Sequence, residues 1–170
     1  MEGDRQAVSL NGYGLTEDWL NILVLIHVLS AVVGIGPVFF GHVLLRKGQN
    51  FGQLRNSLSL SKMLEKFPKI LGSLAVLSGL LLAWLGNYGF KSLWIYGSIV
   101  LYVLIQIVVI GFMAPAAQKA AARAFSGSEP ADTALPDDLA SSVARVDRIN
   151  WIATVLGLLL FLFMFFKPVL

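Results

Sequence analysis

The sequence predicts an all-α membrane protein, a bundle of four transmembrane helices with both termini outside. Apolar residues make up 56% of the 170 residues and charged residues only 14%, and a soluble domain of this size cannot bury so much apolar surface. Four apolar segments are each long enough to cross a bilayer, which takes about 20 residues in a helix. Because lipid offers no partner for free backbone groups, all four should be helical.

The expected elements follow from these segments in chain order. Residues 1–18 should form a polar extracytoplasmic tail, because they lack a basic n-region and lead into a span too long for a signal peptide. The rest, residues 19–170, should be a single transmembrane domain. Its spans are expected at about 19–45, 68–87, 92–118 and 148–167, and its cytoplasmic loops at 46–67 and 119–147.

Lysine and arginine set the predicted orientation. Ten of the 13 Lys and Arg residues fall in or beside the two longer loops, and only Arg5, Lys91 and Lys167 lie on the other side. Since basic loops stay in the cytoplasm, both termini should lie outside a bacterial inner membrane. The sequence pI near 9.3 therefore reflects membrane topology and not a nucleic-acid surface.

The two long loops differ in composition. Residues 51–67 carry regularly spaced leucines on a basic background, which predicts a partly helical segment lying on anionic headgroups. A basic loop that only sets topology is the alternative. Residues 126–138 are rich in Pro, Ser, Gly and acid, which predicts a flexible linker. A short amphipathic helix should then lead from Leu139 into the last span.

Each expected span has one face that is smaller or more polar than its others. Such faces let membrane helices approach closely and keep polar atoms away from lipid, so they should point into the bundle, although packing alone also explains most of them. The first two faces hold His27, Ser30, Ala31, Gly34, Val38, Gly41 and His42, and Gly72, Ala75, Gly79, Ala83 and Gly86. The last two hold Ser98, Tyr102, Gln106, Val109 and Met113, and Asn150, Thr154, Gly157, Phe161 and Met164.

Both histidines of the chain lie in the first span. They should be about 60° apart around the helix and roughly 22 Å apart along it, too far to share one ligand. His42 falls near the cytoplasmic headgroups, where a headgroup or packing role is favoured. His27 lies deeper, where an ionisable group indicates function. A neutral His27 would also be satisfied without a ligand by a hydrogen bond to Tyr102, Gln106 or Thr154.

We therefore expect His27 to bind a cofactor or a metal. Neutral imidazole from a helix is a usual axial ligand of haem, and Met164 is expected at a similar depth. Met113 similarly matches His42. A homodimer supplying a second His27, or a five-coordinate haem, are alternatives, and His with Met would also suit copper(I). The sequence contains no Cys, which excludes thiolate metal sites, iron–sulfur clusters and covalently attached c-type haem.

A likeness to known proteins runs through most of the chain, in the segments IHVLSAVVGIGPVFFGH, LGSLAVLSGLLLAW, VIGFMAPAAQKAA and LFLFMFFKP. Together they resemble an uncharacterised bacterial family of predicted integral membrane proteins, a domain of unknown function. The first segment is also distantly similar to the copper-resistance D family and to HemJ-type protoporphyrinogen oxidases. That resemblance implies haem at such a histidine and carries over only to His27. The chain lacks the arginine motif of the HemJ type.

The sequence thus predicts a bacterial inner-membrane protein that binds haem b or a related redox cofactor through an intramembrane histidine and serves electron transfer. Two alternatives stay open: a non-enzymatic accessory or assembly subunit of a larger membrane complex, and a carrier of copper or a small solute. No acid pair, Ser/His/Asp set or HExxH motif points to hydrolysis. The expected partners are the lipid bilayer and a second copy or a larger membrane complex, and not nucleic acid.

Overall fold

The structure, a computed structural model, describes residues 4–86 and 92–168, with side chains from Asp18 onward. Within these ranges four helical segments are long and apolar enough to span a membrane, and no strand is present beyond an isolated bridge. The all-α, four-span prediction is therefore confirmed. The end of the second predicted span, residue 87, and Lys91 lie outside the described residues. The four segments are Asp18–Leu44, Phe51–Leu85, Leu93–Phe125 and Asp137–Phe166.

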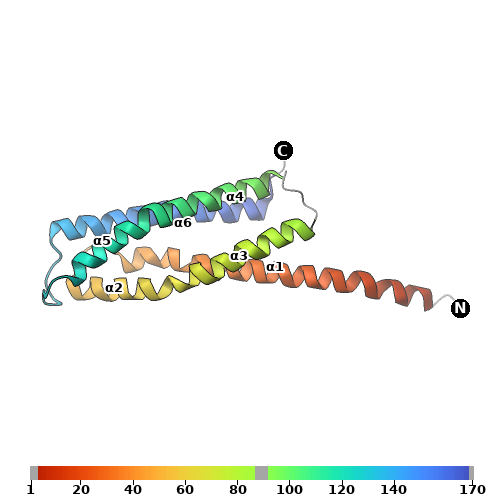
Figure 1. Cartoon of the computed structure of the whole chain (residues 1–170), viewed down its shortest axis with the longest axis horizontal. Helices are drawn as coiled ribbons and strands as arrows, with labels where there is room; N and C mark the ends of the chain where they lie inside the picture. The colour runs from red at the N-terminus through yellow and green to blue at the C-terminus, as the bar shows by residue number, and fades with distance from the viewer. Residues whose placement is uncertain (1–3, 87–91, 169–170) are drawn as a thin grey trace.

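Seven helical elements build these spans in the described part of the chain (Figure 1). The helices run up and down, so that the connections 45–50 and 126–136 lie together at one end, on the left of Figure 1, which we call the loop end. The first helix extends past the others at the opposite end and begins within the stretch predicted as a tail. The elements are α1 (Asp4–Leu44), α2 (Phe51–Leu64), α3 (Lys66–Leu85), α4 (Leu93–Gln106), η1 (Ile107–Met113), α5 (Ala114–Phe125) and α6 (Asp137–Phe166).

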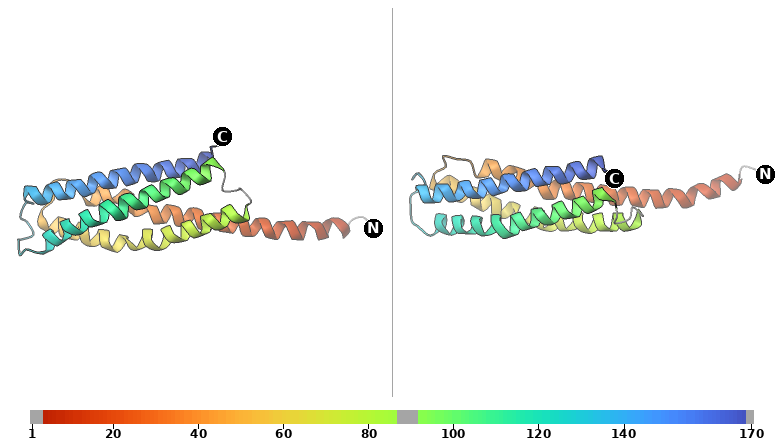
Figure 2. Two further views of the ribbon diagram at one scale, coloured as in Figure 1. Left: turned by 45° about the horizontal axis from the view of Figure 1, so that its top comes forward. Right: turned by 90° about the horizontal axis from the view of Figure 1, so that it is seen from above.

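Small residues bring the helices together in the way the sequence predicts. α1 packs along α3, and α4 along α6, as the two views of Figure 2 show. Gly97 of α4 leaves room for the ring of Phe163, because a Cβ there would lie 2.5 Å from its Cε1 atom. Gly157 of α6 faces Ile35 of α1. The expected inward faces are therefore the ones that pack, with Ser30, Ala75, Ser98, Asn150 and Thr154 all buried.

The outward faces of the same helices are apolar. Leucine, isoleucine, valine and phenylalanine side chains on all four spans are exposed, and Trp19 and Trp84 reach 70% exposure. Such a surface would be unstable in water, but it matches the hydrocarbon of a bilayer. Because lipid offers no hydrogen bonds, the polar groups of the backbone and of the inward faces must find their partners within the protein. The arrangement is that of a membrane-spanning bundle.

The third span contains a seven-residue π-helix, η1, between two α-helices. Its last turn closes with the N–H of Ala114 donating to the carbonyl of Val109. Pro115 follows immediately and has no N–H to give to the carbonyl of Gly111, so the regular α-helical ladder is interrupted at this point. The proline thus explains why the wider turn occurs here.

A compact apolar core fills the loop end, where α1, α2, α5 and α6 meet. Phe51 and Leu54 of α2 are at most 1% exposed. α2 thus turns Phe51 and Leu54 into protein, while Leu60 and Met63 are exposed. It is separated from α3 only by Glu65, and the expectation that residues 51–67 lie on anionic headgroups stays a prediction. This loop-end core consists of Leu45, Phe51, Leu54, Ala120, Ala124, Leu139, Val143 and Val146.

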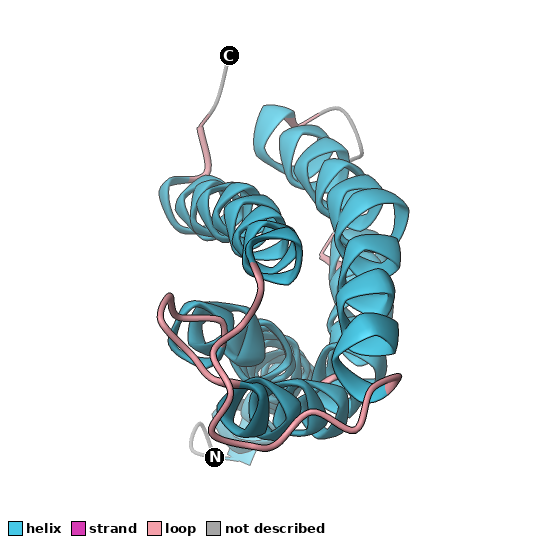
Figure 3. Ribbon diagram, turned by 90° about the vertical axis from the view of Figure 1, so that its left-hand side faces the viewer, coloured by secondary structure: helices cyan, strands magenta, loops and turns pink. Residues whose placement is uncertain are grey.

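The segment 126–136 is held against α2, which differs from the expected flexible linker. Its backbone accepts hydrogen bonds from the N–H groups of Phe51 and Gly52 (Figure 3 shows the loop end face-on). The guanidinium of Arg55 donates to three carbonyls, those of Ala124, Gly127 and Glu129, at 2.8 to 3.2 Å. One arginine therefore satisfies a carbonyl in the last turn of α5 and two carbonyls of the segment that follows it, a contact that composition alone does not reveal.

Candidate functional site

His27 is fixed on α3 by its Nδ1 atom. Nδ1 lies 2.7 Å from the carbonyl oxygen of Ala75 and 3.3 Å from Oγ of Ser78. Because a carbonyl can only accept, Nδ1 carries the hydrogen, and the other ring nitrogen of a neutral imidazole is then a lone-pair acceptor. The partner is a backbone group on the second span, not the Tyr102, Gln106 or Thr154 that the sequence suggested.

The remaining nitrogen of His27, Nε2, has no hydrogen-bond partner among the described residues and is not fully enclosed by them. The ring lies over Gly79, where a Cβ would come within 2.7 Å of the imidazole Cε1 atom and 3.1 Å of Nδ1. A glycine is therefore needed at this position for the ring to reach Ala75. The result is an imidazole with one anchored and one open nitrogen inside a membrane-spanning helix.

His42 has a different environment, in which both nitrogens are engaged. Nδ1 lies 2.8 Å from Oδ1 of Asp147, and Nε2 lies 3.1 Å from Oγ1 of Thr154. The ring stacks on Trp151, with centroids 4.0 Å apart and planes 27° apart. His42 therefore joins α1 to α6, and it offers no free nitrogen to a metal or a haem iron.

Asn150 completes the network around His42. Its Nδ2 atom donates to the carbonyl of Val38 across 3.0 Å and lies 3.3 Å from Nε2 of His42. Thr154 also bonds its own helix, at 2.9 Å from the carbonyl of Asn150. Gly41 makes this approach possible, because a Cβ there would lie 2.5 Å from Nδ2 of Asn150.

Sequence reasoning missed Asp147. The hydropathy pattern begins the fourth span at residue 148 and leaves this carboxylate in the preceding loop, so the sequence predicts only a headgroup or packing role for His42. In the structure α6 is one continuous helix from Asp137 to Phe166, and Asp147 lies on the face that meets α1. The available signal was spacing: Asp147, Asn150 and Thr154 lie three and four residues apart and so share one helix face.

The other predicted site residues lie apart from one another. Ile35 of α1 faces Gly157 of α6. His27 lies eight residues before Ile35, and Met164 lies seven residues after Gly157. Because α1 and α6 run in opposite directions, Met164 lies at the depth of His27. Met113 packs against the loop-end core.

Tyr102 and Gln106, both on α4, are partly buried. Their side chains make no hydrogen bond among the described residues. Neither side chain is therefore joined to either histidine by a hydrogen bond.

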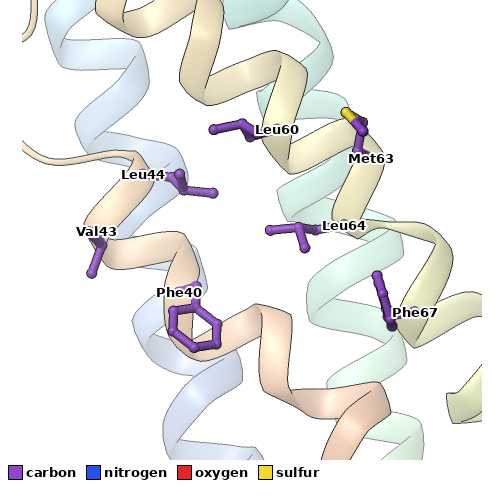
Figure 4. A pocket seen from close by; sticks show the side chains of 7 residues that line it. All are labelled: Phe40, Val43, Leu44, Leu60, Met63, Leu64 and Phe67. Carbon is purple, nitrogen blue, oxygen red and sulfur yellow. The ribbon is translucent and has the colours of Figure 1, made fainter.

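Two further features of the described residues bear on where a ligand could bind. An apolar groove of about 430 Å³ lies between the end of α1 and the junction of α2 with α3 (Figure 4). It presents no polar side chain that could bind a metal or carry a reaction. The described residues also contain no group of three or more His, Cys, Asp or Glu side chains placed to hold a metal ion. The groove is lined by Phe40, Val43, Leu44, Leu60, Met63, Leu64 and Phe67.

A family model described as a predicted integral membrane protein (DUF2269) matches residues 20–168. The chain belongs to this family. Membership in the DUF2269 family confirms the predicted membrane class, and the matched range contains both histidines and the residues bonded to them. It gives no support to the distant likeness to the copper-resistance D or HemJ-type families. No curated protein and no solved structure matches the chain.

Proposed function

We propose that this integral membrane protein binds haem b, or a related redox cofactor, through Nε2 of His27 and serves electron transfer within the bilayer. The observation that carries the proposal is the state of this one imidazole. Its Nδ1–H is anchored on the Ala75 carbonyl, the arrangement that metal-ligating histidines use to fix their tautomer and orientation. The other nitrogen is left open in a region where lipid cannot satisfy it.

His27 and Met164 are the residues that fit a haem. The open Nε2 of His27 would hold a haem through its iron, and the bound haem would supply one-electron chemistry. Met164, at the depth of His27, is the candidate within one chain for a second residue that would hold it. The His27 of a second copy is the other candidate, in a homodimer. Copper(I) is a less favoured ligand, because the described residues offer only His27 with Met164 for it.

An absorption spectrum tests the proposal. Protein purified in mild detergent from a bacterial host should show a Soret band and dithionite-reduced bands, and apoprotein should take up added haemin with the same spectrum. His27→Ala should lose the band, and His42→Ala should keep it, because both nitrogens of His42 already have partners. Met164→Leu separates the candidate ligands. A change from a six-coordinate to a five-coordinate spectrum assigns Met164, an unchanged six-coordinate spectrum assigns a second His27, and an unchanged five-coordinate spectrum leaves His27 as the one ligand.

The alternatives have their own outcomes in the same preparation. A colourless protein that takes up no haemin contradicts the proposal. If partner subunits then co-purify, the accessory or assembly role replaces it. If metal analysis gives stoichiometric copper that is lost in His27→Ala, the copper carrier replaces it.

We also propose a bacterial inner-membrane location with both termini outside. The support is the concentration of Lys and Arg at the loop end, which by the positive-inside rule is cytoplasmic. A reporter active only outside the cytoplasm, fused after Leu170, should be active. A fluorescent protein that folds only in the cytoplasm should stay dark at that position, and the reverse pair of results contradicts this orientation.

A further inference from the structure

We propose that His42 and Asp147 form a reversible proton-binding site at the boundary of the membrane, on the loop-end side of the bundle. The site does not depend on a cofactor at His27. Its elements are the bond from His42 Nδ1 to Asp147 and the contact of Nε2 with Thr154. Each hydrogen-bonding group of this network has a partner both when His42 is unprotonated and when it is protonated.

The depth of the site follows from helix length. From Asp147 to the end of α6 at Phe166 there are 20 residues, which span roughly 30 Å, the thickness of the hydrocarbon core. Asp147 therefore lies at the boundary, and its side chain is 29% exposed while that of His42 is 16% exposed. Thr154 lies two helical turns deeper and is 5% exposed. Water thus reaches the carboxylate and the exposed part of the imidazole, while the Thr154 side chain is enclosed by protein.

In the unprotonated state, His42 is neutral. Its Nδ1–H donates to the Asp147 carboxylate, and its Nε2 lone pair accepts from the hydroxyl of Thr154 or the amide of Asn150, at 3.1 and 3.3 Å. The pair then carries one net negative charge at the edge of a low-dielectric region. Such a charge is costly when nothing balances it.

When a proton from water binds to Nε2, the roles reverse without loss of partners. Nε2–H donates to Oγ1 of Thr154, and the threonine hydroxyl turns to donate to the carbonyl of Asn150, 2.9 Å away. Asn150 keeps its bond to Val38 and gives up only the longer contact with Nε2. The network therefore satisfies both charge states, which a purely structural histidine would not require.

The neighbours of His42 can also hold the protonated ring. An imidazolium beside the Asp147 carboxylate forms a neutral ion pair, and the indole of Trp151, stacked at 4.0 Å, attracts a cation through its ring face. Among the described residues Asp147 is the only charged group in contact with His42. The other charged groups of the packed helices near this level are exposed: Arg46 on α1, Lys62 and Lys66 on α2 and α3, Glu65 paired with Lys69, and Arg148 on α6.

Nitrogen NMR tests the site directly, because the chain has only two histidines. Protein labelled in its histidines and placed in lipid nanodiscs gives the ring-nitrogen signals of two imidazoles, and His27→Asn assigns them. Over about pH 4 to pH 9, Nε2 of His42 should pass between its unprotonated and protonated shifts while Nδ1 stays protonated. A His42 that keeps one protonation state over this range overturns the proposal.

Two pairs of variants test the roles of the partners. Asp147→Asn should lower the proton-binding constant of His42 by about tenfold or more, because it removes the opposite charge at contact distance. Thr154→Val should lower it by a smaller factor, since the protonated state loses its acceptor. Asp137→Asn and Thr133→Val change exposed residues at the loop end and should leave it unchanged.

The signal of His27 reports on folding in each variant. An unchanged Nδ1 shift of His27 shows that the contact of α1 with α3 is intact. If His42 no longer titrates in such a variant, unfolding of the protein is not the cause. If Asp147→Asn and Thr154→Val both titrate as wild type with this signal unchanged, His42 binds its proton without the network, and the site as described is wrong.

Discussion

The backbones of α1 and α3 meet at Gly34 and Gly72. A Cβ placed on Gly34 would lie 2.9 Å from the amide nitrogen of Gly72 and 3.2 Å from the carbonyl carbon of Leu71. Both neighbours are backbone atoms and cannot rotate away, so the two helices would have to separate. This contact fixes the crossing of the first and second spans and, with it, the height at which His27 reaches α3.

The first prediction concerns this crossing. Gly34→Ala should lower the free energy of unfolding in mild detergent by about 1–3 kcal/mol, the usual cost of overpacking a tight contact. Gly36→Ala is the matched control, because it is on the same helix and a Cβ there would meet nothing within 4 Å. Unfolding followed by circular dichroism measures both variants. Equal stability of the two would show that the helices do not touch at Gly34.

The second prediction concerns the seat of His27. In Gly79→Ala the new methyl group would occupy the place of the imidazole edge, 2.7 Å from Cε1, so the ring should move and lose its bond to Ala75. The nitrogen shift of His27 Nδ1 should change, and haem uptake, if the protein binds haem, should fall several-fold. Gly72→Ala, on the same helix with open space at its Cβ, should change neither. An unaltered Nδ1 signal in Gly79→Ala contradicts the placement of the ring.

Much of the fold could be predicted from the sequence, because hydropathy and small-residue spacing are local properties. The inward faces around Gly34, Gly79 and Thr154 follow from helical period alone. The helical period does not show which other helix each face contacts. His27 and Ala75 are 48 residues apart, and the spacing of a stripe on one helix does not say which other helix covers it.

The candidate site shows the same limit more sharply. His42 and Asp147 are 105 residues apart, and the carboxylate lies at the point where hydropathy ends the predicted span. A hydropathy average over neighbouring residues assigns a single charge beside an apolar run to a loop, because the average includes no partner on another helix. Composition predicts a flexible linker at residues 126–138 for a similar reason, since the hydrogen bonds that hold segment 126–136 to Arg55 end on the backbone carbonyls of Gly127 and Glu129, which carry no sequence signal.

The third prediction concerns Arg55 and the segment that it holds. Arg55→Gln removes most of the donors that satisfy the carbonyls of Ala124, Gly127 and Glu129, so segment 126–136 should exchange its amide hydrogens faster and be cut sooner by protease. Lys62→Gln is the control, an exposed basic residue of the same helix. Hydrogen exchange followed by mass spectrometry resolves the segment. Equal exchange in both variants would mean that Arg55 does not hold it.

The last prediction concerns the loop-end core. Leu54 is fully buried there, at 0% exposure, so Leu54→Ala should lower the free energy of unfolding by about 2–5 kcal/mol through lost apolar contact and the cavity left behind. Leu60 lies on the same helix but is 50% exposed, and Leu60→Ala should cost far less. Unfolding of both variants in the same detergent measures the difference. Similar losses of stability in the two variants would contradict the burial of Leu54 in the loop-end core.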